Sequence, residues 1–188
     1  MVAGVDEAGR GAWAGPVVAA MVIFPNENNL AQVLFGVRDS KQINAEKRAY
    51  WAGIIQEQAL AWGVGFSDHS EIDQIGILPA TRLAMQRALE RLTIPAQHLL
   101  IDAVVLPKNT VPQTALIKGD QRSLSIAAAS ILAKTTRDAF MQQEETSYPG
   151  YGFTRHKGYG TRFHQAALKE LGPCPIHRMS FRPLREQS

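Results

Sequence analysis

Short apolar runs, each broken by glycine, proline or a charged residue, alternate along this chain with longer segments of helical periodicity. Residues 1–8 alternate loosely between apolar and polar positions and lead into a glycine-rich turn, which predicts a strand. Residues 17–24 form a continuous apolar run of strand length that closes at Pro25. Turn-forming residues over 26–29 then predict a looped or hairpin-like return.

Helices and strands alternate in the remainder of the chain. We expect helices over residues 45–58, 78–92, 123–143 and 162–171, and strands over 59–66, 99–101 and 115–117. Ser123 is the expected N-cap of the longest helix. Strands that come first and then alternate with helices predict an α/β layer fold. A single compact domain over 1–150, with a helical C-terminal segment over 151–188 packed on it, fits this order best.

Composition agrees with a globular protein and removes several other classes. Hydrophobic residues make up 45% of the 188 positions and charged residues 20%, unlike disordered or fibrous chains. No apolar run approaches the ~20 residues that span a bilayer, and no basic segment precedes an apolar stretch at the start, so we expect neither a membrane span nor a signal peptide. Cys174 is the single cysteine, which excludes a disulfide framework. We expect a cytoplasmic monomer.

Charge is distributed unevenly along the chain. The net charge is only +3, but residues 151–188 hold seven basic and two acidic residues, whereas residues 1–150 hold 13 basic and 15 acidic ones. A basic segment beside an acidic body suits a polyanionic ligand that is bound on one side and processed on the other. An ordinary solvated terminal helix is the alternative.

Four acidic residues follow or end strand candidates, where α/β folds usually hold ligands: Asp6, Glu7, Asp102 and Asp120. Carboxylates gathered there repel one another unless cations neutralise them, and hard oxygen ligands suit Mg²⁺ or Mn²⁺. Two such ions can activate a water and stabilise the leaving oxygen of a phosphodiester. The alternative is that these acids are helix caps or surface residues.

Two local features bear on this site. Adjacent strand residues point to opposite faces, so Asp6 and Glu7 share a site only if the backbone bends or Glu7 offers its carbonyl. The turn that follows, Gly9-Arg10-Gly11, superficially resembles a dinucleotide-binding turn, but two acids beside a pyrophosphate argue against that. Its glycines instead permit main-chain groups to approach a ribose, whose 2′-hydroxyl is both donor and acceptor. A plain tight turn is the alternative.

Beyond these single features, a series of motifs along the chain resembles those of a known family, and the motifs occur in the same order as in that family. They are Asp6-Glu7-Ala8-Gly9-Arg10-Gly11, Ala14-Gly15-Pro16-Val17-Val18-Ala19-Ala20, Asp39-Ser40-Lys41, Leu100-Ile101-Asp102, Lys118-Gly119-Asp120, Ser125 to Lys134 with Thr136-Arg137-Asp138, His156-Lys157-Gly158-Tyr159-Gly160-Thr161 and His177-Arg178-Met179-Ser180-Phe181. The family is type 2 ribonuclease H (ribonuclease HII). Ala12 and Ala103 depart from it, since the family often has proline and glycine there.

The resemblance implies a ribonuclease H-like mixed sheet flanked by helices, with the catalytic domain in 1–150. It implies an endonuclease that cuts RNA in RNA–DNA hybrids and single ribonucleotides embedded in duplex DNA, using Mg²⁺ or Mn²⁺ and leaving 3′-hydroxyl and 5′-phosphate ends. The implied catalytic carboxylates are Asp6, Glu7, Asp102 and Asp120, with Asp6, Glu7 and Asp102 as metal ligands. The implied substrate-binding residues are Gly9, Arg10, Gly11, Lys41 and Tyr159.

The residues themselves support some of these roles. Tyr159 between two glycines is well placed to pack on a sugar, with a core tyrosine as the alternative. Lys41 lies in a polar loop and can neutralise a phosphate, or is merely solvated. Asp138, a rival fourth carboxylate, is expected in a surface ion pair with its helical neighbours. The histidines His156, His164 and His177 lack the spacing of a zinc-binding helix and are expected on a basic face or in packing.

Two other functions stay open at this stage. A non-catalytic duplex-binding module predicts salt-sensitive binding without metal-dependent cleavage, although a binder gains nothing from acids placed beside a phosphate. A different nuclease of the same fold, such as a junction resolvase, predicts cleavage of substrates that contain no ribonucleotide.

Overall fold

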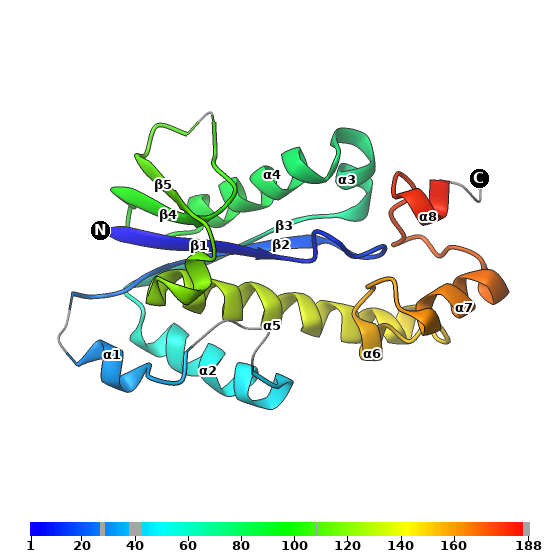
Figure 1. Ribbon diagram of the computed structural model, residues 1–188, viewed down its shortest axis with the longest axis horizontal. Helices are drawn as coiled ribbons and strands as arrows, with labels where there is room; N and C mark the ends of the chain where they lie inside the picture. Colours follow the sequence, from blue (N-terminus) through cyan, green and yellow to red (C-terminus); the bar gives the residue numbers. More distant parts are fainter. Residues whose placement is uncertain (27–28, 38–42, 108, 186–188) are drawn as a thin grey trace.

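The computed structural model describes residues 1–26, 29–37, 43–107 and 109–185. Within them a five-stranded mixed sheet carries helices on both faces, which confirms the predicted α/β class (Figure 1).

The order and direction of the strands determine which chain ends meet. The strands are β1 (Val2–Ala8), β2 (Val17–Ile23), β3 (Ala61–Ser67), β4 (His98–Asp102) and β5 (Gln113–Leu116), in the sheet order β3-β2-β1-β4-β5. β2 pairs antiparallel with both β1 and β3, whereas β1, β4 and β5 are parallel to one another. The carboxyl ends of β1, β4 and β5 therefore lie at the same edge of the sheet.

Helices of very different lengths surround the sheet. They are α1 (Leu30–Val33), α2 (Ala45–Gln58), α3 (His69–Ile75), α4 (Ile77–Glu90), α5 (Leu124–Ser147), α6 (Phe153–His156), α7 (Arg162–Leu171) and α8 (Arg182–Arg185), with a 3₁₀ turn, η1 (Gly119–Gln121). Figure 1 shows α4 over one face of the sheet, α5 along the other face, and α2 on the outer side of α5. The helices α6, α7 and α8 gather at the end of the molecule toward which β1 points.

Strand periodicity divides the core into two layers. All seven residues of β2 are buried, because it lies between β1 and β3 with helices on both faces. Its odd-numbered residues, such as Met21, pack with α4, and its even-numbered residues, such as Val22, pack with α5. On the α5 side, the buried alanines Ala127, Ala128 and Ala129 allow the helix to approach the sheet closely.

A third apolar cluster attaches the C-terminal segment to the far end of α5. Met141 of α5 packs there with Phe153 of α6 and Leu168 of α7. The segment is also tied to α3, since the Asp73 carboxylate accepts hydrogen bonds from the main-chain N–H groups of Met179 and Ser180 at 2.9 and 3.0 Å. The predicted helical C-terminal segment is therefore present and packs on the sheet domain.

Most long elements have the bounds expected from the sequence, and the short ones were not predicted. α2 and α7 coincide with the predicted 45–58 and 162–171, and Ser123 is the N-cap residue of α5, although its side chain makes no capping hydrogen bond. The helices α1, α3, α6 and α8 have only four to seven residues, too few for apolar periodicity to be visible. No helix among the described residues combines the length and apolar composition needed to cross a bilayer.

Because β1 and α5 are in close contact, a single methyl group added at Gly4 should strongly reduce the stability of the protein. A Cβ added at Gly4 would lie 2.1 Å from the main-chain carbon of Ser125, where neither backbone can move away cheaply. We expect Gly4→Ala to lower the free energy of unfolding by about 3 kcal/mol or more, measured by urea denaturation.

Gly53→Ala is the matched control, because Gly53 lies inside α2 and an added Cβ meets no atom within 4 Å. It should raise the free energy of unfolding by about 0.5–1 kcal/mol. Equal effects at the two glycines would contradict the tight β1–α5 contact.

Candidate active site

Three of the four predicted acids meet at the carboxyl edge of the parallel strands. β1 and β4 pair with Val5 opposite Ile101, and the next residue of each strand, Asp6 and Asp102, faces α5. Asp120 lies in η1, which follows β5 and precedes α5. One carboxylate oxygen from each of Asp6, Asp102 and Asp120 lies within 4.8 Å of the other two. We call these three residues the acid cluster.

Main-chain and hydroxyl donors orient the acid cluster. The Asp6 carboxylate accepts a hydrogen bond from the Glu7 N–H at 2.8 Å and one from the side chain of Ser130 in α5. The Asp102 carboxylate accepts from the Gly119 N–H at 3.0 Å, which links the end of β4 to η1. The carboxylates of Asp6 and Asp102 are therefore oriented by hydrogen bonds before any cation binds.

Burial gives Asp6 unusual acid–base behaviour. The Asp6 residue is 7% exposed, and this burial, with added repulsion from Glu7 and Asp102, raises the pKa of Asp6 to about 8. A carboxyl group in this position binds a proton near neutral pH unless a cation replaces it. The donors of the acid cluster are all oxygens, so they fit Mg²⁺ or Mn²⁺ and not a softer metal.

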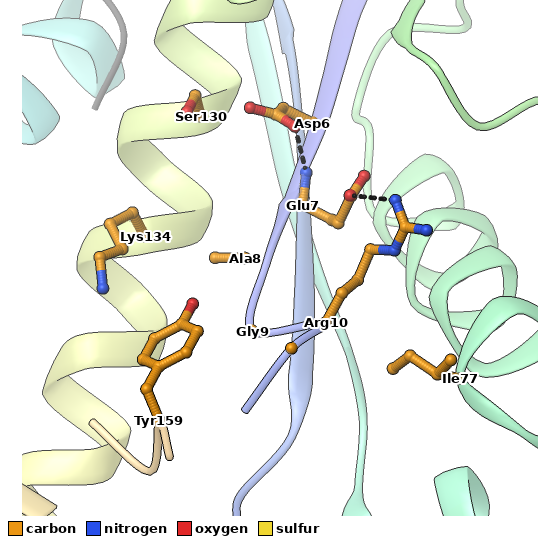
Figure 2. A pocket seen from close by; sticks show the side chains of 10 residues that line it. Asp6, Glu7, Ala8, Gly9, Arg10, Ile77, Ser130, Lys134 and Tyr159 are labelled. Atoms are coloured by element: carbon orange, nitrogen blue, oxygen red, sulfur yellow. Dashed lines mark hydrogen bonds and ion pairs between the residues drawn. The ribbon is translucent and has the colours of Figure 1, made fainter. Parts of the chain in front are cut away.

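Glu7 lies outside the acid cluster. It occupies the opposite face of β1 from Asp6, as the alternation of a regular strand requires. Its carboxylate pairs with the Arg10 guanidinium at 3.2 Å, and Figure 2 shows the two carboxylates pointing to different sides of the strand. The backbone bend that sequence analysis required for a shared site is absent at Asp6 and Glu7.

An open cavity of about 690 Å³ lies over Asp6 and Glu7. In Figure 2, Ser130, Lys134 and Tyr159 form its α5 side, and Ile77 stands at the start of α4 on the other side. The glycine loop, which consists of Gly9, Arg10 and Gly11, lines the space between these walls. The cavity thus combines acids, a main-chain loop, a lysine and a tyrosine.

Two fully buried arginines hold the glycine loop and the residues after it. Arg178, from the C-terminal segment, donates to the main-chain carbonyls of Arg10 at 3.0 Å and Gly15 at 2.9 Å. Arg137, from α5, donates to the carbonyls of Ala14, Pro16 and Lys157 at 2.9–3.1 Å. All their hydrogen bonds within the described residues end on main-chain carbonyls.

Arg137 also determines why residue 9 is glycine. Gly9 has φ +95°, and a Cβ at this position would lie 2.0 Å from Nε of Arg137. Both the backbone conformation and the close guanidinium require a residue without a side chain.

Tyr159 is joined to this loop region by main-chain contacts. It forms an isolated β-bridge with Ala12, and the N–H of Trp13 donates to the Gly158 carbonyl at 2.8 Å. The half-buried Tyr159 ring lies 5.2 Å from the Arg137 guanidinium and 5.5 Å from Lys134 Nζ. Segments more than 140 residues apart in the chain therefore form one continuous surface.

The remaining predicted residues have mixed outcomes. Lys41 falls outside the described residues. Asp138 pairs with Lys134 at 2.6 Å and Arg48 at 3.2 Å, so the expected ion pair is present; its expected place on the surface is wrong, because the Asp138 residue is 9% exposed. Asp138 is not part of the acid cluster, since α5 carries it two turns beyond Ser130.

The histidines are buried, which confirms packing and excludes a basic face. His156, His164 and His177 are at most 6% exposed, and burial lowers the pKa of each one. Cys174 is buried beside them, and burial raises the pKa of its thiol to about 11.

Sequence analysis assigned no functional role to four residues that form part of the site: Ser130, Lys134, Arg137 and Arg178. Ser130 and Lys134 are one helical turn apart and so share the face of α5 that lines the cavity. That spacing was visible in the sequence. The two arginines gave no comparable signal, because their partners are main-chain carbonyls, which no residue pattern marks.

Comparison with known proteins identifies the relatives of this chain. The family model described as ribonuclease HII matches residues 3–183. Ribonuclease HII of Geobacter metallireducens is 53% identical over 185 residues, covering 98% of this chain and 85% of that protein. Ribonuclease HII of Roseiflexus castenholzii is 56% identical over 185 residues, covering 97% and 82%.

Solved structures agree in fold. The ribonuclease H2 of Pyrococcus horikoshii superposes with a TM-score of 0.83 at 28% identity, covering 98% of this chain and 95% of that one. Bst-RNase HIII in complex with Mn²⁺ has a TM-score of 0.71 at 19% identity, covering 98% and 68%, and so shares the fold.

The raised pKa of Asp6 predicts proton release when the acid cluster binds a cation. At pH 7 the metal-free carboxyl is mostly protonated, so Mn²⁺ must displace that proton, and affinity should rise about tenfold per pH unit up to pH 8. Titration calorimetry at pH 7 in two buffers of different ionisation enthalpy measures the proton count. Asp6→Asn should abolish the release, and a wild-type titration without any release would contradict the assignment.

The backbone beside Asp102 predicts a stabilising substitution. Ala103 has φ +61°, a left-handed conformation that costs a residue with a Cβ about 1–2 kcal/mol. After allowance for the greater freedom of glycine in the unfolded chain, Ala103→Gly should raise the free energy of unfolding by up to about 1 kcal/mol. Ala115→Gly in β5, where φ is ordinary, is the control and should lower it. Urea denaturation distinguishes the two signs.

Proposed function

Because this chain belongs to the ribonuclease HII family, it is a metal-dependent endoribonuclease that cleaves the RNA of RNA–DNA hybrids, and we propose which of its residues perform the reaction. The family function includes cleavage at single ribonucleotides embedded in duplex DNA, with 3′-hydroxyl and 5′-phosphate products. One observation carries the residue assignment: the acid cluster lies at a cavity whose walls also hold the glycine loop and Tyr159.

The acid cluster holds the catalytic cation. Asp6, Asp102 and Asp120 supply converging carboxylate oxygens, and Ser130 and Gly119 orient two of these groups by hydrogen bonds. A bound Mg²⁺ or Mn²⁺ supplies Lewis acidity at the scissile phosphate and lowers the pKa of water. Bst-RNase HIII, a protein of the same fold, was solved in complex with Mn²⁺, which supports Mn²⁺ as one of the two candidate ions.

Glu7 is the fourth catalytic carboxylate in this proposal. Its ion pair with Arg10 is half-exposed on the arginine side, so a substrate phosphate can compete for the guanidinium. When Arg10 contacts the phosphate, the Glu7 carboxylate stays on its own face of β1, at the wall of the cavity. Because that face is opposite to Asp6, the expected role of Glu7 as a metal ligand beside Asp6 and Asp102 is assigned to its main-chain carbonyl, the alternative to a backbone bend.

Recognition of the sugar is assigned to the main chain of the glycine loop and to Tyr159. Gly9 and Gly11 bring peptide groups to the cavity without obstruction by a side chain, which suits contact with a 2′-hydroxyl. Tyr159 packs on the deoxyribose that follows the ribonucleotide, and Lys134 beside it offers a positive charge to a phosphate. Lys41 keeps its proposed phosphate contact.

The organisation around the site completes the proposal. Residues 1–150 form the catalytic part, and the basic residues 151–188 hold the duplex on the side of Tyr159. The expectation of a cytoplasmic monomer is kept as part of this proposal.

Replacement of single acids tests the assignment. Asp6→Asn and Asp102→Asn each remove a cation ligand and should lower the cleavage rate of a duplex with one embedded ribonucleotide by more than about 100-fold. Binding of the same duplex in EDTA should be retained, because each substitution removes a negative charge that would repel the phosphates of the duplex. Sizing of labelled fragments with Mg²⁺ measures cleavage, and fluorescence anisotropy measures binding.

Asp68→Asn is the control, since asparagine serves equally as the N-cap of α3. It should cleave as the wild type does. A duplex that contains only DNA should not be cleaved. Cleavage at the wild-type rate by Asp6→Asn or Asp102→Asn would contradict the assignment.

A further inference from the structure

A buried chain of side chains ends on the peptide that presents Tyr159. Its members are Cys174, His177 and His164, which lie in the C-terminal segment behind the cavity wall. Cys174 N–H lies 2.9 Å from His177 Nδ1, the two histidines meet through their Nε2 atoms at 2.9 Å, and His164 Nδ1 lies 3.1 Å from the Tyr159 carbonyl oxygen. No step of the proposed reaction uses these groups.

The Tyr159 carbonyl determines the position of every proton in this chain. Because a carbonyl oxygen can only accept, His164 carries its proton on Nδ1 and donates it to Tyr159. His164 Nε2 is then an acceptor, so His177 carries its proton on Nε2 and donates it to His164. His177 Nδ1 therefore accepts from the Cys174 N–H at 2.9 Å, although the carbonyl oxygen and Sγ of Cys174 also lie 3.1 Å from it.

Both histidines are neutral in this arrangement. Both residues are at most 1% exposed, and burial lowers the pKa of His164 and of His177 to about 4. The tautomers are therefore stable at neutral pH, and His164 acts as a fixed donor.

The turn that carries Tyr159 needs such support. Lys157 and Gly158, the two residues before it, have φ of +53° and +80°. The Gly158 N–H donates to Nδ1 of His156, and the His156 ring stacks on His164 with centroids 4.4 Å apart. The turn is thus held from the buried side by two stacked imidazoles, one accepting from residue 158 and one donating to residue 159.

We propose that His164 and His177 are positioning residues for Tyr159, and that their hydrogen-bond chain determines how the tyrosine ring meets the sugar next to the cleaved ribonucleotide. The inference rests on the proposed role of Tyr159 in substrate binding. His164 and His177 touch neither the substrate nor the acid cluster, so their replacement should raise KM and leave kcat and cation binding close to wild type.

Two substitutions at His164 separate the donor from the ring. In His164→Asn, the amide nitrogen occupies the place of Nδ1 and continues to donate to the Tyr159 carbonyl. In His164→Gln, the amide lies at the place of Nε2, so contact with His177 is kept and the donor to Tyr159 is lost. Loss of this donor should raise KM for a duplex with one embedded ribonucleotide about tenfold, whereas His164→Asn should change KM less than about threefold.

A double-mutant cycle with Tyr159→Ala distinguishes positioning from general loss of stability. Without the tyrosine ring, His164→Gln should raise KM less than about twofold further, because both changes act through the same group. If the two changes multiply instead, or if Asn and Gln at position 164 are equally impaired, the positioning role is wrong while the role of Tyr159 stands. Wild-type KM for Tyr159→Ala would overturn the role of Tyr159 and the positioning role together.

A second pair of variants covers the case in which position 164 does not tolerate replacement. His177→Gln keeps a donor at the place of Nε2, and His177→Asn removes it. The proposal requires the larger KM for His177→Asn, with thermal midpoints and Mn²⁺ titrations recorded for every variant. The reverse order, in proteins with equal midpoints, would contradict it.

Discussion

The parallel pairing of β1 with β4 is the constraint on which the acid cluster depends. The register that sets Val5 opposite Ile101 places Asp6 and Asp102 on the same face at the same height. A slip of one residue in either strand would turn one carboxylate toward α4 and separate the pair. Close approach of α5, which the lack of a side chain at Gly4 permits, then brings Ser130 to Asp6. Cation binding and sheet formation are therefore linked through one ladder of hydrogen bonds.

Recognition of the sugar depends on a different kind of interaction. Arg137 and Arg178 place two positive charges in the interior, which is costly without compensation. Five main-chain carbonyls, mostly from the turn between β1 and β2, provide that compensation. An arginine has several donors in a fixed fork, so it can fix a loop with no regular structure of its own. The carbonyls of Arg10 and Gly15 are therefore held in place from the interior of the protein.

Sequence patterns predicted the long elements and the acids, because both follow from local rules. The helices over 45–58 and 162–171 were visible from their helical pattern, and the acids from their place at strand ends. The separation of Glu7 from Asp6 followed from strand alternation. The burial of Asp138 and the roles of Arg137 and Arg178 could not be predicted, because they depend on which distant backbone each side chain meets.

The hydrogen bond between Arg178 and the Arg10 carbonyl joins positions 168 residues apart. During synthesis on the ribosome, all five strands and the three residues of the acid cluster emerge before Arg178 does, so this contact forms after their synthesis. Long-range closure of this kind slows folding and leaves early intermediates without it. The glycine loop therefore acquires the donor to its Arg10 carbonyl only after every residue of the acid cluster has been synthesised.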